Sequence, residues 1–97
     1  MPDTRSEHAA DDNLRKKLVY RANHRGTKEM DLLVGGYVTK HIHDMTNYDL
    51  DELAVILELP DADIDAWATG KAELPAQYDT KLMNAILSFS YKPADYS

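Results

Sequence analysis

Residues 25–29 concentrate the most chemistry in the shortest space, and they read Arg-Gly-Thr-Lys-Glu. The Arg25 guanidinium is planar and carries five donors, so it suits two-point recognition of a carboxylate. Gly26 has no side chain, so a partner backbone can approach it closely. Together with the Glu29 carboxylate, these residues predict a docking point for a larger protein. Local structure also accounts for them, because Gly26 can end one helix and Thr27 can cap the next.

Other candidate sites in the sequence are weaker. His41 and His43 are two residues apart, so on a helix they point in different directions and do not form the i, i+4 pair of a metalloprotease helix. Ser, Thr, His and Asp are present, but no strand-turn-helix elbow holds a nucleophile. Gly35 and Gly36 lie in an apolar pattern rather than after a strand, which argues against a phosphate loop. We therefore predict no catalytic residue, no metal site and no stably bound cofactor, in a protein that is not an enzyme.

The motif lies between two amphipathic patterns that predict helices. The first helix is expected to begin at a cap on Asp12 or Asn13 and to run to about His24. The second is expected to run from Thr27 to about His43. The core-facing positions of the two helices are Leu14, Leu18 and Ala22, then Met30, Leu33, Val34, Tyr37, Val38, His41 and Met45.

The pair Gly35-Gly36 is the weak point of the second helix. Each Gly in a helix interior costs about 1 kcal/mol relative to Ala. We therefore expect either that a neighbour packs closely against this pair or that the helix bends there.

Three shorter helices follow, at residues 50–57, from residue 61 to Gly70, and at about residues 78–91. Their apolar stripes have helical spacing, and no period-two pattern predicts a strand. The sequence therefore predicts an all-α fold, a compact five-helix bundle of short helices.

The domain organisation follows from these elements. We predict a disordered N-terminal tail at residues 1–12, a helical domain at residues 13–91 and a C-terminal tail at residues 92–97. The 97 residues include no cysteine, which excludes disulfides and thiolate chemistry. No apolar run is long enough for a secretory signal or a bilayer span, so we expect a cytoplasmic protein without direct membrane insertion.

Charge is distributed unevenly along the chain. Residues 14–28 hold six basic residues and no acidic one, whereas residues 29–97 hold four lysines and thirteen acidic residues. This split predicts a positive patch on a negative body. Such a patch can meet nucleic acid, an acidic membrane or an acidic protein surface, or it can be a solvated helix face.

A helix-turn-helix DNA reader is an alternative for residues 50–70, whose apolar spacing fits that motif. The expected recognition helix would expose Asp61, Asp63 and Asp65 and no Lys or Arg, so DNA phosphates would repel it. Any two short helices packed at a wide angle give the same spacing. We expect no nucleic-acid partner, and a nucleic-acid-binding or antitoxin-like regulatory module stays open as the alternative function.

Residues 25–29 also match the RGxxE motif of the small FAD assembly factors for succinate dehydrogenase. Residues 17–22 and 30–33 resemble the flanks of that motif in the family, and residues 57–64 and 67–70 resemble a second family stretch. The resemblance covers roughly residues 14–90. It implies a five-helix protein that binds the flavoprotein subunit of succinate dehydrogenase, and in bacteria also that of fumarate reductase. Such proteins promote covalent attachment of FAD to a histidine of that client, so FAD would belong to the client.

The resemblance also implies which residues face the partner. Carried over by position, they are Arg25, Gly26 and Glu29, with Asp31 next to them and Arg21 in the basic flank. We expect the protein to be a monomer and the Arg25 side chain to be exposed, because partner binding through the guanidinium requires it. In this chain position 23 is Asn, where relatives carry an aromatic residue, so an apolar anchor beside the motif is expected to be missing.

Overall fold

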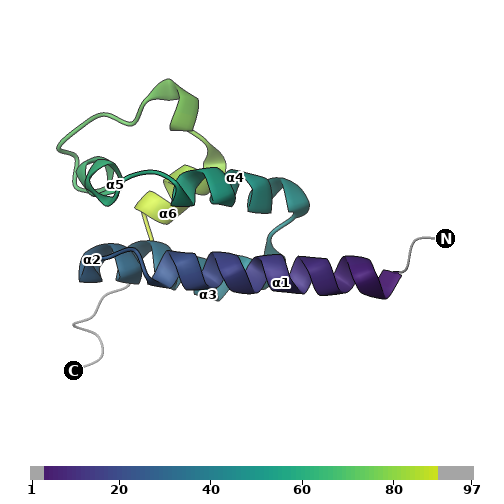
Figure 1. The fold of residues 1–97 in the computed structure, drawn as a ribbon. Helices are drawn as coiled ribbons and strands as arrows, with labels where there is room; N and C mark the ends of the chain where they lie inside the picture. Colours follow the sequence, from purple (N-terminus) through teal and green to yellow (C-terminus); the bar gives the residue numbers. More distant parts are fainter. Residues whose placement is uncertain (1–3, 90–97) are drawn as a thin grey trace.

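The computed structural model describes residues 4–89, with side chains from residue 11 onward, and every regular element in this range is helical (Figure 1). The prediction of an all-α fold is confirmed. The elements are α1 (Thr4–Asn23), α2 (Lys28–Met30), the π-helical turn η1 (Asp31–Gly35), α3 (Gly36–His41), the 3-10 turn η2 (Ile42–Asp44), α4 (Asn47–Leu57), α5 (Asp61–Ala68), the 3-10 turn η3 (Ala76–Tyr78) and α6 (Lys81–Leu87).

The path from α2 through η1 to α3 is one helical run, because the backbone keeps right-handed helical angles at Met30, Asp31, Gly35 and Gly36. Counted in this way, the described part of the chain forms five helices. The run follows the predicted second helix closely, but the π turn within it was not expected. In a π turn the hydrogen bonds span five residues instead of four, so the turn holds one residue more than an α-helical turn of the same kind.

Three threonines set the starts of helices. The hydroxyls of Thr27, Thr46 and Thr80 each accept a bond from the backbone N–H three residues later, at 3.3, 3.1 and 3.1 Å. At Thr46 the bond is reciprocal, since the Asp49 carboxylate accepts from the Thr46 N–H at 3.0 Å. These caps satisfy N–H groups that have no partner inside the helix, and they explain where α2, α4 and α6 begin.

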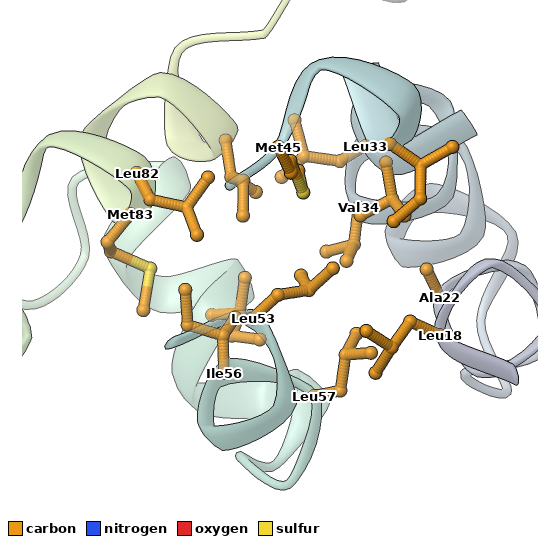
Figure 2. Close-up of a cluster of buried hydrophobic side chains, with 14 of the residues drawn as sticks. Leu18, Ala22, Leu33, Val34, Met45, Leu53, Ile56, Leu57, Leu82 and Met83 are labelled. Atoms are coloured by element: carbon orange, nitrogen blue, oxygen red, sulfur yellow. The ribbon is translucent and has the colours of Figure 1, made fainter. Parts of the chain in front are cut away.

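The elements enclose one apolar core, in which α1, the α2–α3 run, α4 and α6 point side chains at a common centre (Figure 2). Leu53 of α4 and Val34 of η1 have no exposed surface. The buried set is Leu18, Ala22, Met30, Leu33, Val34, Val38, Ile42, Met45, Leu50, Leu53, Ile56, Leu57, Ile64, Leu82, Met83 and Ile86. The core therefore joins every helix of the bundle, and it contains most of the positions that apolar spacing predicted.

A neighbouring segment packs closely against each glycine of the pair Gly35-Gly36. Close packing was one of the two expectations for this pair. A Cβ on Gly35 would lie 2.5 Å from Asn23 Oδ1 and 3.0 Å from the Ala22 carbonyl oxygen. A Cβ on Gly36 would lie 2.9 Å from Cε2 of Phe89. Helix α1 and the chain after α6 can approach the central run this closely only because both positions lack a side chain.

Arg15 fastens α1 to the end of the central run. Its Nη2 donates to the Met45 carbonyl at 3.0 Å, its Nη1 donates to the Ile42 carbonyl, and its Nε lies 3.0 Å from Asp11 Oδ2. The guanidinium thus bonds two carbonyls at the end of the run, where intrahelical donors run out, and the Ile42 carbonyl also accepts from the Met45 N–H at 3.3 Å.

Helix α1 begins at Thr4, so the predicted start at Asp12 or Asn13 is wrong. Residues 4–12, which the sequence analysis assigned to a disordered tail, belong to α1 in the structure, and residues 1–3 lie outside the described part. The segment lacks an apolar face, but it contains good helix formers such as Glu7, Ala9 and Ala10, and adding residues to an existing helix needs no new nucleus. These turns of α1 extend beyond α4 in Figure 1.

Two further details differ from the sequence prediction. Leu14 is 39% exposed instead of buried. The last helix runs from Lys81 to Leu87, and Tyr78 belongs to the separate turn η3, because Thr80 provides the cap. Residues 90–97, which include the expected end of that helix and the predicted C-terminal tail, lie outside the described residues.

Candidate functional site

The motif forms the corner between α1 and α2. Gly26 has a φ of +115°, a conformation that residues with a Cβ rarely adopt, so the positive φ predicted for this glycine is confirmed, whereas α1 itself ends three residues earlier, at Asn23. Thr27 is extended and caps α2. Both Gly26 and Glu29 are exposed, which leaves a bare backbone with a carboxylate beside it at the outside of the corner.

The Arg25 side chain is buried, and the prediction that it is exposed is wrong. Only 5% of the side chain is accessible. Its Nε lies 2.5 Å from Asp61 Oδ1, its Nη1 donates to the Leu57 carbonyl at 3.1 Å, and its Nη2 donates to the Leu59 carbonyl. The guanidinium thus satisfies carbonyls at the end of α4 and a carboxylate at the start of α5. These bonds occupy the fork of donors that was expected to bind a partner.

Asp31 holds the corner from the other side. Its Oδ1 accepts a bond from the backbone N–H of Arg25 at 2.6 Å, and the residue is half-buried. The sequence placed Asp31 among the partner-facing residues, but its carboxylate bonds within the chain. Arg25 and Asp31 together fix the backbone on both sides of Gly26, so the corner is rigid.

Arg21 lies on the exposed surface of α1, where it pairs with Glu58. The accessible fractions of the two side chains are 42% and 71%, so water screens this pair and it adds little stability. Of the five residues predicted to face a partner, the structure therefore exposes Arg21, Gly26 and Glu29, and it turns Arg25 and Asp31 inward.

Two hollows flank the corner. One, of about 390 Å³, lies between α1 and the α4–α5 loop and is lined by Tyr20, Arg21, His24, Arg25, Leu57, Leu59, Pro60 and Asp61. The other, of about 580 Å³, lies between α2 and α5 and is lined by Thr27, Glu29, Met30, Asp61, Ala62 and Asp65. Asp61 belongs to both hollows and was missed as a site residue. It has the position of an ordinary helix-start carboxylate, and nothing near it in the sequence points to Arg25.

Comparison with known proteins identifies the family. The family model described as "Flavinator of succinate dehydrogenase" (Sdh5) matches residues 16–90. The chain belongs to this family. The "FAD assembly factor SdhE" of Acetobacter pasteurianus is 39% identical over 84 residues, which cover 84% of this chain and 77% of the relative. The mitochondrial "Succinate dehydrogenase assembly factor 2" of Dictyostelium discoideum is 39% identical over 75 residues, and the match spans about half of that relative, 53%.

This member of the flavinator family has an asparagine beside the motif that bonds within the fold. The Asn23 amide donates to the Val19 carbonyl at 2.8 Å and to Thr39 Oγ1 at 3.0 Å, so it links α1 to α3. Its Oδ1 occupies the space that a Cβ on Gly35 would need. A compact amide at position 23 therefore matches the glycine opposite it, which gives Asn23 a packing role in this chain.

The surface of this family member argues against the DNA-reading alternative. Helices α4 and α5 are present as expected, and the first turn of α5 carries Asp61 and Asp63.

Among the described residues no cluster of three His, Asp or Glu side chains has a metal-binding arrangement. Within the same residues no helix is both long and apolar enough to cross a membrane.

Proposed function

We propose that this protein binds the flavoprotein subunit of succinate dehydrogenase and promotes covalent attachment of FAD to a histidine of that subunit. The family match over residues 16–90 carries the proposal, because it includes the corner and both hollows. The relatives are named as assembly factors rather than as enzymes. The flavoprotein subunit of fumarate reductase is a second client under the same proposal.

The exposed corner supports a positioning role. A helper protein accelerates a reaction in its client when it holds the reacting groups in a productive geometry. It does so by binding one client conformer more tightly than the others, which shifts the population toward that conformer. In this proposal Gly26 lets a client backbone approach closely, and Glu29 and Arg21 supply charged hydrogen bonds beside it.

Arg25 acts in this proposal by positioning the corner instead of touching the client. Its bonds to Asp61, Leu57 and Leu59 fix the corner against α4 and α5. A preorganised corner binds more tightly, since less conformational freedom is lost on association. FAD is the client's cofactor in this scheme. The cytoplasmic location stays a prediction, since relatives with mitochondrial names also match the chain.

Co-expression with the flavoprotein subunit tests the proposal. Fluorescence of flavin in a denaturing gel reports covalent FAD on the subunit. Wild-type protein should raise this signal above that of the subunit expressed alone, and Glu29→Ala should lower it. Glu73→Ala removes another exposed carboxylate, between α5 and η3, and should act like wild type. If wild-type protein leaves the signal at the level of the subunit alone, the proposed function is wrong.

A further inference from the structure

The side of Gly26 that a side chain would cover is open except at one atom. Apart from the adjoining residues, the only described atom within 4 Å of a Cβ on Gly26 would be Asp61 Oδ2, at 3.8 Å. Gly26 itself is exposed. A group that a partner lays against this glycine therefore also comes close to an oxygen of Asp61.

The two oxygens of the Asp61 carboxylate have different surroundings. Oδ1 lies 2.5 Å from Arg25 Nε, whereas no donor among the described residues bonds Oδ2. In the same part of the chain no buried side-chain oxygen lacks a hydrogen-bond partner, so Oδ2 reaches solvent. The Asp61 side chain is 20% accessible. Oδ2 is therefore an acceptor that a partner can use.

Arg25 holds this acceptor in place. The guanidinium is 5% accessible, and its other two nitrogens donate to the carbonyls of Leu57 and Leu59. A donor fixed in this way fixes Oδ1 in turn, and Oδ2 stays beside Gly26. A preorganised acceptor loses little conformational freedom when a partner binds, so its hydrogen bond adds more to affinity.

The backbone of Gly26 adds hydrogen-bonding groups of its own. No backbone hydrogen bond in the described range involves the N–H or the C=O of Gly26, whereas the N–H of Arg25 is bonded to Asp31. The corner thus presents polar backbone groups beside the carboxylate oxygen and no bulk between them. An extended polypeptide matches such a surface, because its backbone alternates N–H and C=O groups and needs no room for a side chain.

We propose that Asp61 is a contact residue for the client: Oδ2 accepts a hydrogen bond from a backbone N–H of an extended segment of the flavoprotein subunit that crosses Gly26. The backbone groups of Gly26 pair with the same segment, and Arg25 holds the acceptor without touching the client. This inference rests on the proposed function. It adds to the RGxxE motif a residue that the fold brings to the corner from the start of α5.

Titration of the purified flavoprotein subunit into the full-length protein tests the inference. In Asp61→Asn the amide oxygen can still accept from Arg25, so the NH₂ group takes the place of Oδ2 and offers a donor to a donor. We expect Kd to rise about tenfold or more. Asp63→Asn is the matched control, because it removes an exposed carboxylate of the same helical turn that lines neither hollow, and Kd should stay within about twofold of wild type.

A double-mutant cycle separates contact from positioning. Arg25→Gln removes the guanidinium and leaves the Asp61 carboxylate, so any effect that Asp61 has through Arg25 is absent in this background. We expect Asp61→Asn to raise Kd by a further threefold or so in the Arg25→Gln protein. No further rise would mean that Asp61 acts only through Arg25, and the inference would be wrong.

A basic side chain of the client is the other donor that can reach Oδ2. In that case Asp61→Asn would reduce the dependence of Kd on salt by more than Asp63→Asn does, and the assignment to a backbone N–H would be wrong. We expect the two variants to show the same salt dependence, because a backbone N–H carries no net charge.

Amide hydrogen exchange of the wild-type complex gives a measurement that needs no variant. Binding of the subunit should slow exchange of the Gly26 amide by about tenfold or more. Gly70 is the control, since it is also an exposed glycine with a positive φ, and its exchange should not change. Unchanged exchange at Gly26 in the complex would overturn the inference.

The outcomes also separate this inference from the proposed function. If Asp61→Asn binds the subunit like wild type while Glu29→Ala binds it more weakly, the contact at Asp61 is refuted and the proposed function stands. If wild-type protein does not bind the subunit, both are refuted.

Discussion

The Arg25 guanidinium and the Asp61 carboxylate form an ion pair across 36 residues of sequence, with Nε 2.5 Å from Oδ1. This pair ties the corner between α1 and α2 to the start of α5. The first residue of the RGxxE motif is therefore part of the internal structure of the fold, and of the three fixed positions of the motif only Gly26 and Glu29 are exposed.

We expect Arg25→Ala to lower the free energy of unfolding by about 3 kcal/mol. The change leaves a partly buried Asp61 carboxylate and two carbonyls without their donor, and breaking a buried pair is strongly destabilising. Urea denaturation measures the difference. Arg21→Ala is the matched control, because it breaks an exposed pair and should cost less than about 1 kcal/mol. Equal losses for the two variants would show that the Arg25 bonds do not stabilise the corner.

Two substitutions at Gly26 separate backbone strain from bulk. With φ at +115°, any side chain is strained, and we expect Gly26→Ala to cost about 1–3 kcal/mol in unfolding free energy. Gly26→Arg should cost a similar amount, because a Cβ there meets only Asp61 Oδ2, at 3.8 Å. The bulky variant should in addition lose binding to the flavoprotein subunit. Equal affinity of the two variants, measured by titration, would mean that no client backbone approaches Gly26.

The two adjacent glycines of the central run should respond differently to alanine. We expect Gly35→Ala to destabilise by about 2 kcal/mol or more, because the new methyl meets the Asn23 amide and the backbone carbonyl of Ala22. We expect less than about 1 kcal/mol for Gly36→Ala, because the Phe89 ring can shift and alanine favours the helix. Thermal unfolding of both variants gives the comparison. A larger loss for Gly36→Ala than for Gly35→Ala would contradict the packing described here.

Two residues of α4 test where the core lies. Leu53 has no exposed surface, so Leu53→Ala should lower the unfolding free energy by about 2–5 kcal/mol through lost burial and a cavity. Val55 on the same helix is 55% exposed, and Val55→Ala should change it by less than about 1 kcal/mol. Chemical denaturation of both proteins measures the contrast. Similar losses for the two variants would mean that the face of α4 that carries Leu53 is not the one that packs in the core.

The sequence predicts the features that depend on neighbours along the chain. Gly26 takes a positive φ between two helices because of its own backbone freedom, and Thr27 caps the next helix with a bond to a residue three positions on. The helical class and most of the core follow from apolar spacing in the same way. The sequence analysis also placed residues 25–29 between two helices, from the same local signals and from the family resemblance.

The features that depend on distant residues were not predictable in this way. The burial of Arg25 depends on Asp61, Leu57 and Leu59, more than thirty positions away, and nothing in residues 25–29 distinguishes a guanidinium that binds its own fold from one that binds a partner. The start of α1 was missed for a different reason. A polar helical segment has no periodic apolar pattern, so apolar spacing does not detect it.

The π turn at Asp31–Gly35 determines how far the remainder of the central run is rotated. Successive residues of an α-helix are turned by about 100° about its axis. If the same five residues closed as an ordinary α-helix, every later residue would turn further by about one position, and Tyr37 and His41 would take the inward places of Val38 and Ile42. Val38 and Ile42 are now buried, so the π turn is what keeps this apolar pair directed at the core. The extra residue of the turn could be deleted without rotating the remainder of the run, whereas conversion of the turn to α-helix could not occur without repacking the core.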